Sequence, residues 1–523
     1  MIQISEKQKK QLITVILAIF AWGFFAHGFM IFNKLSIHDD IHNVFDVGAT
    51  FYSGRWALGI LEKVTEAYLG GIFSMPVFNG IMTMIFVALI LLTLVELFRI
   101  ENVYSIIGLS GIFVTYPTIT TLFGYMFTAP YYFFGFWLMI IAAYCICKKK
   151  KWYLWVLSIF FFAFSVGIYQ SSIALFCSII ILYFFKELSG YPGDMPIDIQ
   201  IKKILFYIAT VFCGLVVYFL INKIFLTYNN LENMTSYQGI SSMGYTSVVG
   251  YCLRVFKTYK EFIAPSAEIR MQIYPFGSYY MFLLVDLIYI FIAFLNTVTL
   301  LKRGYYWKGI ETFALELLIP LVSNCIFIMC DAKETTIHLI MMYSNVIFYL
   351  SVLVVLQNTQ NIINDGKNKY KLEKCIVYFR YCICLLMTIL SFQYSRFSNA
   401  CYLKATLKQQ ENISYFTTLI TRIKSTKGYD DKYPVVYIGN SISDCTITEL
   451  GEFRSIEAYP YQTDFLSVNA FSWKDTMRLW CGFSPLEGDE RIFTANEEVD
   501  KMPCYPDDGS IMIIDGNVVV KFN

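Results

Sequence analysis

Residues 11–40 read QLITVILAIFAWGFFAHGFMIFNKLSIHDD, and this stretch decides the fold class. The part from 11 to 33 contains no Asp, Glu, Lys or Arg, and a helix needs about 20 mostly apolar residues to cross a bilayer. Polar residues follow directly and end in Asp39 and Asp40. Because no small-residue cleavage site follows the apolar run, we expect a retained membrane-spanning helix with an acidic pair just beyond its end.

The whole chain has the composition of a membrane protein. Of its 523 residues, 57% are hydrophobic and only 15% are charged, whereas soluble domains are about 25% charged. The 41 basic and 39 acidic residues leave a net charge of +2, so no overall positive charge attracts nucleic acid. Composition therefore predicts an integral membrane protein with no nucleic-acid partner.

Further apolar stretches predict a polytopic protein with about eleven spans. The stretches are 11–33, 76–98, 103–118, 130–147, 152–168, 173–186, 204–225, 277–300, 310–330, 339–357 and 376–394. Lysine and arginine cluster in alternate connections, which the positive-inside rule places in the cytoplasm. The clusters include Lys9, Lys10, Arg99, Lys202, Lys203, Lys302, Arg303 and the runs 148–151 and 367–374. We therefore expect a cytoplasmic N-terminus and outer loops at 34–75 and 226–276.

Two segments need a more specific interpretation. The stretch 152–186 is too long for one helix and short for two. We interpret it as a helical hairpin with its outer turn at 167–172, since a single tilted helix would place the flanking lysine clusters on opposite sides. Residues 56–68, within the first outer loop, have an amphipathic pattern that predicts a helix lying along the membrane interface.

The last part of the chain differs in composition, with polar and charged residues throughout. Strand-like runs at 435–438, 510–515 and 518–520, after a helix-like stretch at 402–423, predict a small α/β domain on the outside. We therefore divide the chain into 1–394 and 395–523. Four cysteines of this part could form disulfides in an oxidising compartment or remain free thiols: Cys401, Cys445, Cys481 and Cys504. Its aromatic residues Tyr459, Tyr461 and Trp473 could stack on acceptor sugars or belong to the core.

The acidic pair is the strongest candidate for chemistry. Adjacent carboxylates at a membrane surface repel each other and seek a cation, a proton or a hydroxyl donor. The alternative is a polar cap that only ends the apolar helix. Two of the four histidines, His38 and His42, flank Asp39 and Asp40, which favours a functional site. A divalent metal at the pair is possible, although the chain shows no metal-binding spacing.

Other outer residues could bind a substrate. Arg55 could contact a lipid phosphate with the Trp56 ring at headgroup level, or the two could be a membrane anchor. Tyr169 and Gln170 lie in the predicted outer turn, where the amide could bond a sugar hydroxyl or complete a polar turn. Cations of the 226–276 loop are further candidates: Arg254, Lys257, Lys260 and Arg270.

These motifs together resemble the bacterial glucosyltransferase family typified by the GtrII serotype-converting enzymes. The resemblance rests on the segments 35–40, 54–56 and 168–171 and spans roughly residues 1–390. It implies a GT-C-like polytopic enzyme of the bacterial cytoplasmic (inner) membrane. It also implies transfer of a sugar, glucose or another hexose, from a polyprenyl-phosphate carrier to a cell-surface glycan such as O-antigen or cell-wall polysaccharide. A polyprenyl-phosphate glycosyltransferase and a flippase would be its functional partners.

The resemblance also implies that an acidic residue of the first outer loop is the catalytic base. We therefore expect Asp39 to take the proton of the acceptor hydroxyl and Asp40 to orient the acceptor or the donor phosphate. The sequence shows no second carboxylate at a fixed spacing that could act as a covalent nucleophile. We therefore expect a single displacement that inverts the anomeric carbon of the sugar. Arg55 is the nearest cation in sequence for the leaving phosphate.

Three other functions remain open at this point. A flippase or transporter of a lipid-linked saccharide would place ionisable residues in its spans, and only Asp286, Glu311 and Glu316 are candidates for this. A surface-polysaccharide polymerase or ligase would use the same lipid-linked substrates and a long outer loop. A non-catalytic scaffold is the third.

Overall fold

The chain divides into two compact units in a computed structural model. The structure describes residues 5–37, 39–44, 53–70, 74–148, 151–232, 246–330, 337–364, 369–439, 456, 460–461, 472–493 and 496–522. The first unit, here the membrane unit, comprises Met1–Lys34 and Gly48–Asn399; the second, the terminal unit, comprises Leu35–Val47 and Ala400–Asn523. We expected a division near residue 395 with the whole 34–75 loop on the membrane side. The segment that carries the acidic pair belongs instead to the terminal unit.

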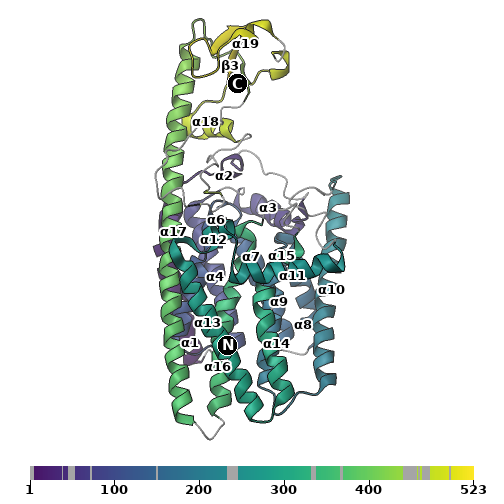
Figure 1. The fold of residues 1–523 in the computed structure, drawn as a ribbon. Coiled ribbons are helices and arrows are strands. Elements are labelled where there is room, and N and C mark those ends of the chain that lie inside the picture. Colours follow the sequence, from purple (N-terminus) through teal and green to yellow (C-terminus); the bar gives the residue numbers. More distant parts are fainter. Residues whose placement is uncertain are drawn as a thin grey trace. The chain divides into compact units, whose positions relative to one another are not determined.

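The membrane unit is entirely helical in its described part (Figure 1). Its helices are α1 (Glu6–Phe32), α3 (Trp56–Leu69), α4 (Pro76–Phe98), α5 (Val103–Thr115), α6 (Pro117–Phe123), α7 (Ala129–Lys148), α8 (Trp152–Ile168), α9 (Ser172–Ser189), α10 (Ile197–Tyr228), α11 (Val248–Ile263), α12 (Ala267–Ile273), α13 (Ser278–Lys302), α14 (Tyr306–Ser323), α15 (Ile326–Met329), α16 (Val346–Asn364) and the first part of α17 (Lys369–Ser425). Short 3-10 turns join some of them, at Pro275–Gly277, Leu339–Met341 and Tyr343–Asn345.

Within the described residues, nine helices are long and apolar enough to cross a membrane. Two more of the expected spans fall on α8, which is shorter, and on α14, which carries Lys308, Glu311 and Glu316. The polytopic helical class therefore agrees with the sequence, while the number of eleven spans stays a prediction. The expected pair of helices in 152–186 is confirmed, because α8 ends at Ile168 and α9 begins at Ser172.

Small polar residues join the central helices of the membrane unit. Ser158 and Ser165 lie two turns apart on α8 and donate hydrogen bonds to the carbonyls of Ala142 and Gly135 on α7, at 2.8 and 2.7 Å. In lipid, where apolar contact alone gives little preference for another helix, such bonds and close backbone approach hold helices together. They fix α8 on α7.

The segment 226–276, expected as an outer loop, contains two helices that sequence analysis missed, and its place outside the membrane stays a prediction. Helix α10 continues to Tyr228, and α11 and α12 follow within the segment. The polar side chains of α11, Arg254, Thr258 and Glu261, are buried, whereas its apolar residues Leu253 and Phe256 are exposed. These polar residues repeat at helical spacing on one face, so they mark the inward side of a helix.

The terminal unit contains a three-stranded sheet, and its predicted strands are confirmed. β1 (Val435–Ile438) pairs in parallel with β3 (Asn517–Lys521), which pairs antiparallel with β2 (Ile511–Ile514). Asp515 and Gly516 form the two-residue turn between β2 and β3, with φ of 47° and 72°, as a tight hairpin of this hand requires. Two short helices complete the unit: α18 (Trp473–Cys481) and α19 (Glu497–Lys501).

Helix α17 supplies the core of the terminal unit. The stretches expected as two helices, 376–394 and 402–423, are one helix, because no glycine or proline interrupts Lys369–Ser425. Its residues Phe416 and Leu419 pack in one cluster with Val518 of β3 and with Trp473. Trp473 and Tyr461 are 3% and 2% exposed, so both are buried aromatics rather than a sugar-stacking surface.

Four cysteines and Tyr459 of the terminal unit were singled out by the sequence. Among the described residues, Cys401, Cys481 and Cys504 are free thiols. Cys445 and Tyr459 lie outside the described residues.

Candidate active site

The acidic pair lies on a four-residue helix, α2 (Asp39–His42), that is built into the terminal unit. His42 Nδ1 lies 2.8 Å from Asp475 Oδ2 of α18. The Ser36 amide donates to Gln409 Oε1 of α17 at 2.9 Å. Ile41 is 1% exposed and belongs to the cluster of Phe416 and Trp473 described above. Three contacts from distant parts of the sequence thus hold α2 in place.

The two aspartates occupy different environments. Asp40 is 1% exposed, whereas Asp39 is partly exposed. Burial, and then the neighbouring Tyr402, Cys401 and Asp40, raise the pKa of the Tyr461 hydroxyl well above its usual value. Tyr461 therefore remains a neutral hydroxyl beside Asp40. Of the pair, Asp39 is the more exposed residue, although its Oδ1 is buried.

Buried cations lie on the same part of α17. The inward stripe of this helix is apolar at Cys401 and Ala405 but polar at Lys404, Lys408 and Asn412, which are 3%, 3% and 2% exposed. Lys404 Nζ donates to the carbonyl of Ile456 at 3.0 Å. A buried ammonium group is retained only with hydrogen-bonding or charged partners. Sequence analysis missed these lysines, although charged residues four apart on an apolar helical stripe are a detectable signal.

The membrane unit brings together the Arg55 and Tyr169 motifs. The guanidinium of Arg55 lies 5.2 Å from the ring centroid of Tyr169 and 5.9 Å from that of Tyr132. The two rings are stacked with centroids 4.6 Å apart, and Arg55 Nη1 donates to the Tyr132 hydroxyl at 3.0 Å. A cation over aromatic faces gains electrostatic attraction and a defined orientation. Arg55 is therefore held rather than freely mobile.

The turn before Arg55 is fastened by two side chains from other helices. Gln170 Nε2 donates to the Ser53 carbonyl at 2.8 Å, and the Tyr218 hydroxyl donates to the Gly54 carbonyl at 3.0 Å. Gly54 has φ of 75°, and a Cβ there would meet the Tyr218 hydroxyl at 2.6 Å, so only glycine fits. The Gln170 amide thus completes a polar turn, which is the alternative to the sugar contact considered above.

The remaining expected site residues are placed as follows. Trp56 is 2% exposed, with its ring edge-on to Phe164 at 5.7 Å, so the ring packs inside the unit rather than against lipid. Arg254 is buried on α11 and donates to the Ile328 carbonyl of α15 at 3.2 Å. Lys257, on the same helix, is partly exposed. His38 lies outside the described residues.

A metal ion would need several ligands close together. Within the part of the chain that the structure describes, no three His, Cys, Asp or Glu side chains gather closely enough to hold one. A divalent ion at Asp39 and Asp40 therefore stays a prediction.

Comparison with known proteins gives one match. The family model described as glucosyl transferase GtrII matches residues 28–355. The match includes α2, the Arg55 turn and Tyr169, and it ends within α16, before α17. No curated protein and no solved structure matches the chain significantly.

Proposed function

Because this chain belongs to the glucosyl transferase GtrII family, we propose that it transfers a hexose, glucose first among the candidates, from a polyprenyl-phosphate carrier to a surface polysaccharide. We place the reaction at the outer face of the bacterial cytoplasmic membrane, with the N-terminus in the cytoplasm and the terminal unit outside. The family and the helical membrane fold support a membrane glycosyltransferase. The alternating lysine clusters support this sidedness, and a GT-C-like architecture is part of the proposal.

The observation that carries the proposal is the placement of Asp39. An acceptor hydroxyl is a poor nucleophile, and a positioned carboxylate that accepts its proton as the new C1–O bond forms supplies general-base catalysis. Asp39 is partly exposed on a helix held by three contacts, while Asp40 is buried near Tyr461. We therefore assign the base to Asp39 and the positioning of α2 to Asp40.

The leaving phosphate needs a cation. We propose Arg55, because a guanidinium presents parallel donors to phosphate oxygens and its orientation is set by Tyr132 and Tyr169. In a single displacement the acceptor oxygen bonds C1 as the C1–O bond to phosphate breaks, which inverts the anomeric configuration.

The transporter alternative gains no support from Glu311 and Glu316 of α14, two of the three acids considered for it. Glu311 accepts hydrogen bonds from Gln200 Nε2 at 3.0 and 3.1 Å, and Glu316 accepts one from Asn296 Nδ2 at 2.8 Å. These bonds join neighbouring helices, which is a packing role.

The proposal is tested in cells by replacing Asp39 and Asp40 separately with asparagine and measuring surface-glycan composition by mass spectrometry. We expect Asp39→Asn to remove one side-chain sugar while the polysaccharide backbone stays intact. Asp508→Asn, at a fully exposed carboxyl of the same unit, is the matched control and should keep the sugar. Retention of the sugar in both Asp39 and Asp40 variants at normal expression would refute the proposed base. Shortened chains would indicate a polymerase, and accumulated inward-facing lipid-linked sugar a flippase.

A further inference from the structure

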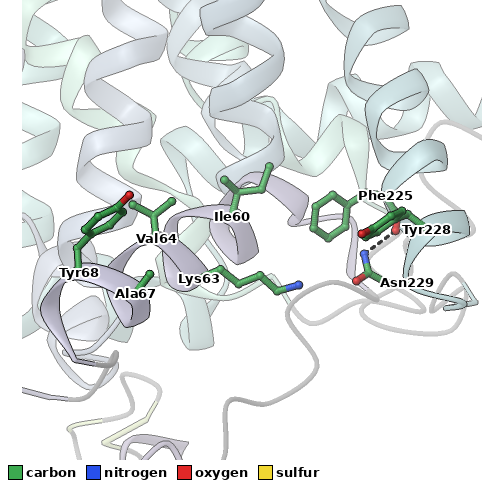
Figure 2. A pocket seen from close by; sticks show the side chains of 8 residues that line it. All are labelled: Ile60, Lys63, Val64, Ala67, Tyr68, Phe225, Tyr228 and Asn229. Atoms are coloured by element: carbon green, nitrogen blue, oxygen red, sulfur yellow. Dashed lines mark hydrogen bonds between the residues drawn. The ribbon is translucent and has the colours of Figure 1, made fainter.

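A groove opens between α3 and the end of α10 in the membrane unit (Figure 2). It has a volume of about 260 Å³, and its walls include Ile60, Val64 and Ala67 from α3 and Phe225 and Tyr228 from α10. Asn229 Nδ2 donates to the Phe225 carbonyl at 2.8 Å and closes the end of α10. The groove is thus a mostly apolar channel between two helices.

One cation lies on this apolar surface. Among the described residues that line the groove, Lys63 is the one that carries a charge, and its Nζ lies 5.9 Å from the centroid of the Phe225 ring. A lysine stem covers apolar surface while its ammonium stays at the rim. An apolar channel with one ammonium at its edge is complementary to a lipid chain joined to a single negative charge.

Exposed tyrosines indicate the depth of the groove in the membrane. Tyr68 and Tyr228, which line it, are 83% and 84% exposed. Tyrosine rings of this kind gather at the level of the lipid headgroups. The tyrosines therefore favour a position for Lys63 near the level of lipid phosphates.

Two carboxyls of α3, those of Glu62 and Glu66, lie close to Lys63 in the sequence. Burial, and then Glu66, raise the pKa of Glu62 to about 7 against the lowering effect of Lys63. The Glu62 carboxyl is therefore protonated in a large fraction of molecules near pH 7. Glu66 is exposed. Neither carboxyl lines the groove, so Lys63 supplies the charge at its edge among the described residues.

The spacing from Arg55 decides which lipid fits. Lys63 follows Arg55 by eight positions along α3, which places their backbones about 12 Å apart at 1.5 Å per residue. The Arg55 guanidinium is held on the Tyr132 and Tyr169 rings, whereas the Lys63 ammonium lies over the Phe225 ring, so each cation has its own setting for a phosphate. If the donor phosphate is at Arg55, as proposed above, the anion at Lys63 belongs to a second lipid.

We propose that the groove between α3 and α10 binds an anionic glycerophospholipid of the membrane, with its phosphate on Lys63 and one acyl chain against Ile60, Val64 and Phe225. Helix α3 starts directly after Arg55, so a lipid in this groove holds the helix from which Arg55 is positioned. The proposed role of Arg55 enters only in the choice of phospholipid over carrier.

The test is photo-crosslinking of the purified full-length protein in vesicles with a diazirine-bearing phosphatidylglycerol, followed by peptide mass spectrometry. We expect labelling of the peptides around 60–68 and 225–229, several-fold above that with the matching phosphatidylcholine. Lys63→Gln should lower this labelling several-fold, and Lys63→Arg should restore it. Ala67→Trp, which fills the groove, should also lower it. Lys223→Gln, at an exposed lysine of α10 that does not line the groove, should leave it unchanged.

Equal labelling by the two phospholipids, or labelling that Lys63→Gln does not change, would overturn the site. Displacement of the label by an equimolar amount of polyprenyl phosphate would overturn the choice of lipid and assign the groove to the carrier. The readout does not depend on sugar transfer, so failure of the proposed function leaves this result interpretable.

Discussion

At the scale of single residues, two neighbouring carboxyls have different environments. Asp40 is buried near Tyr461, and Asp39 is partly exposed at the start of α2. The sequence placed the pair beyond the first helix and favoured Asp39 as the base, but it held no information on the burial of either residue, because adjacent identical residues carry the same local signal. Asp40 is buried by contacts in the terminal unit with residues that lie more than 350 positions later in the chain.

Arg55 gives the clearest prediction at this scale. Arg55→Lys keeps the charge but removes the planar donor pair and its contact with the Tyr132 and Tyr169 rings. A charged hydrogen bond contributes about 1.5–3 kcal/mol, so we expect kcat/KM for sugar transfer to fall about 10- to 100-fold. Tyr132→Phe, which removes only the hydroxyl acceptor and keeps the ring, serves as the control and should cost less. A lysine variant as active as the wild type would exclude the proposed phosphate contact.

The partners of Arg55 show where residue-level prediction ends. Arg55, Tyr169 and Gln170 were each singled out by sequence, and the structure brings them together. Tyr132 and Tyr218 were missed, because a tyrosine within an apolar helix has no local feature that distinguishes a contact residue from ordinary packing. Only the arrangement of α7 and α10 around the Gly54 turn reveals them.

At the scale of elements, periodicity predicted well where one face of a helix is polar and outward. Helix α3 follows this pattern, whereas the pair α8 and α9 was predicted from the length of the apolar stretch and the flanking lysines. Helix α11 was missed, because its polar residues face inward and its apolar residues face outward, opposite to the pattern expected of a soluble helix. The break expected in α17 is absent because a change of composition alone does not end a helix.

Helix α3 gives a prediction about pH. Burial raises the pKa of Glu62 to about 7 from an ordinary 4.5, so the folded protein holds this proton up to a higher pH than the unfolded chain. The unfolded chain loses the proton near pH 4.5 and the folded protein only near pH 7, so the cost of this carboxyl to stability builds up between these two values and is complete above about 7. We expect Glu62→Gln to melt at a higher temperature than the wild type at pH 8.5, and at the same temperature at pH 4 in detergent.

The matched control for this experiment is Glu66→Gln, at an exposed carboxyl of the same helix. It should shift the melting temperature less at either pH. An unchanged pH dependence in Glu62→Gln would show that the buried carboxyl is not the titrating group.

At the scale of the whole molecule, the segment 35–47 leaves the membrane unit to join the terminal unit. Chain order favoured the opposite assignment, because the segment directly follows α1 and precedes α3. Its partners, Gln409, Phe416 and Asp475, lie hundreds of residues later. Composition was sufficient for the membrane class and the strands, but pairing between such distant segments requires the structure.

The central claim is that this membrane protein moves a sugar from a lipid carrier with Asp39 as base. The most direct measurement is the rate of transfer from polyprenyl-phosphate-linked glucose to surface polysaccharide by the purified protein in vesicles, for the wild type and for Asp39→Asn. General-base catalysis contributes about 10²- to 10⁴-fold, so we predict transfer by the wild type and a loss of that size in the variant. Transfer by Asp39→Asn at the wild-type rate, or no transfer by a folded wild-type protein, would contradict the account.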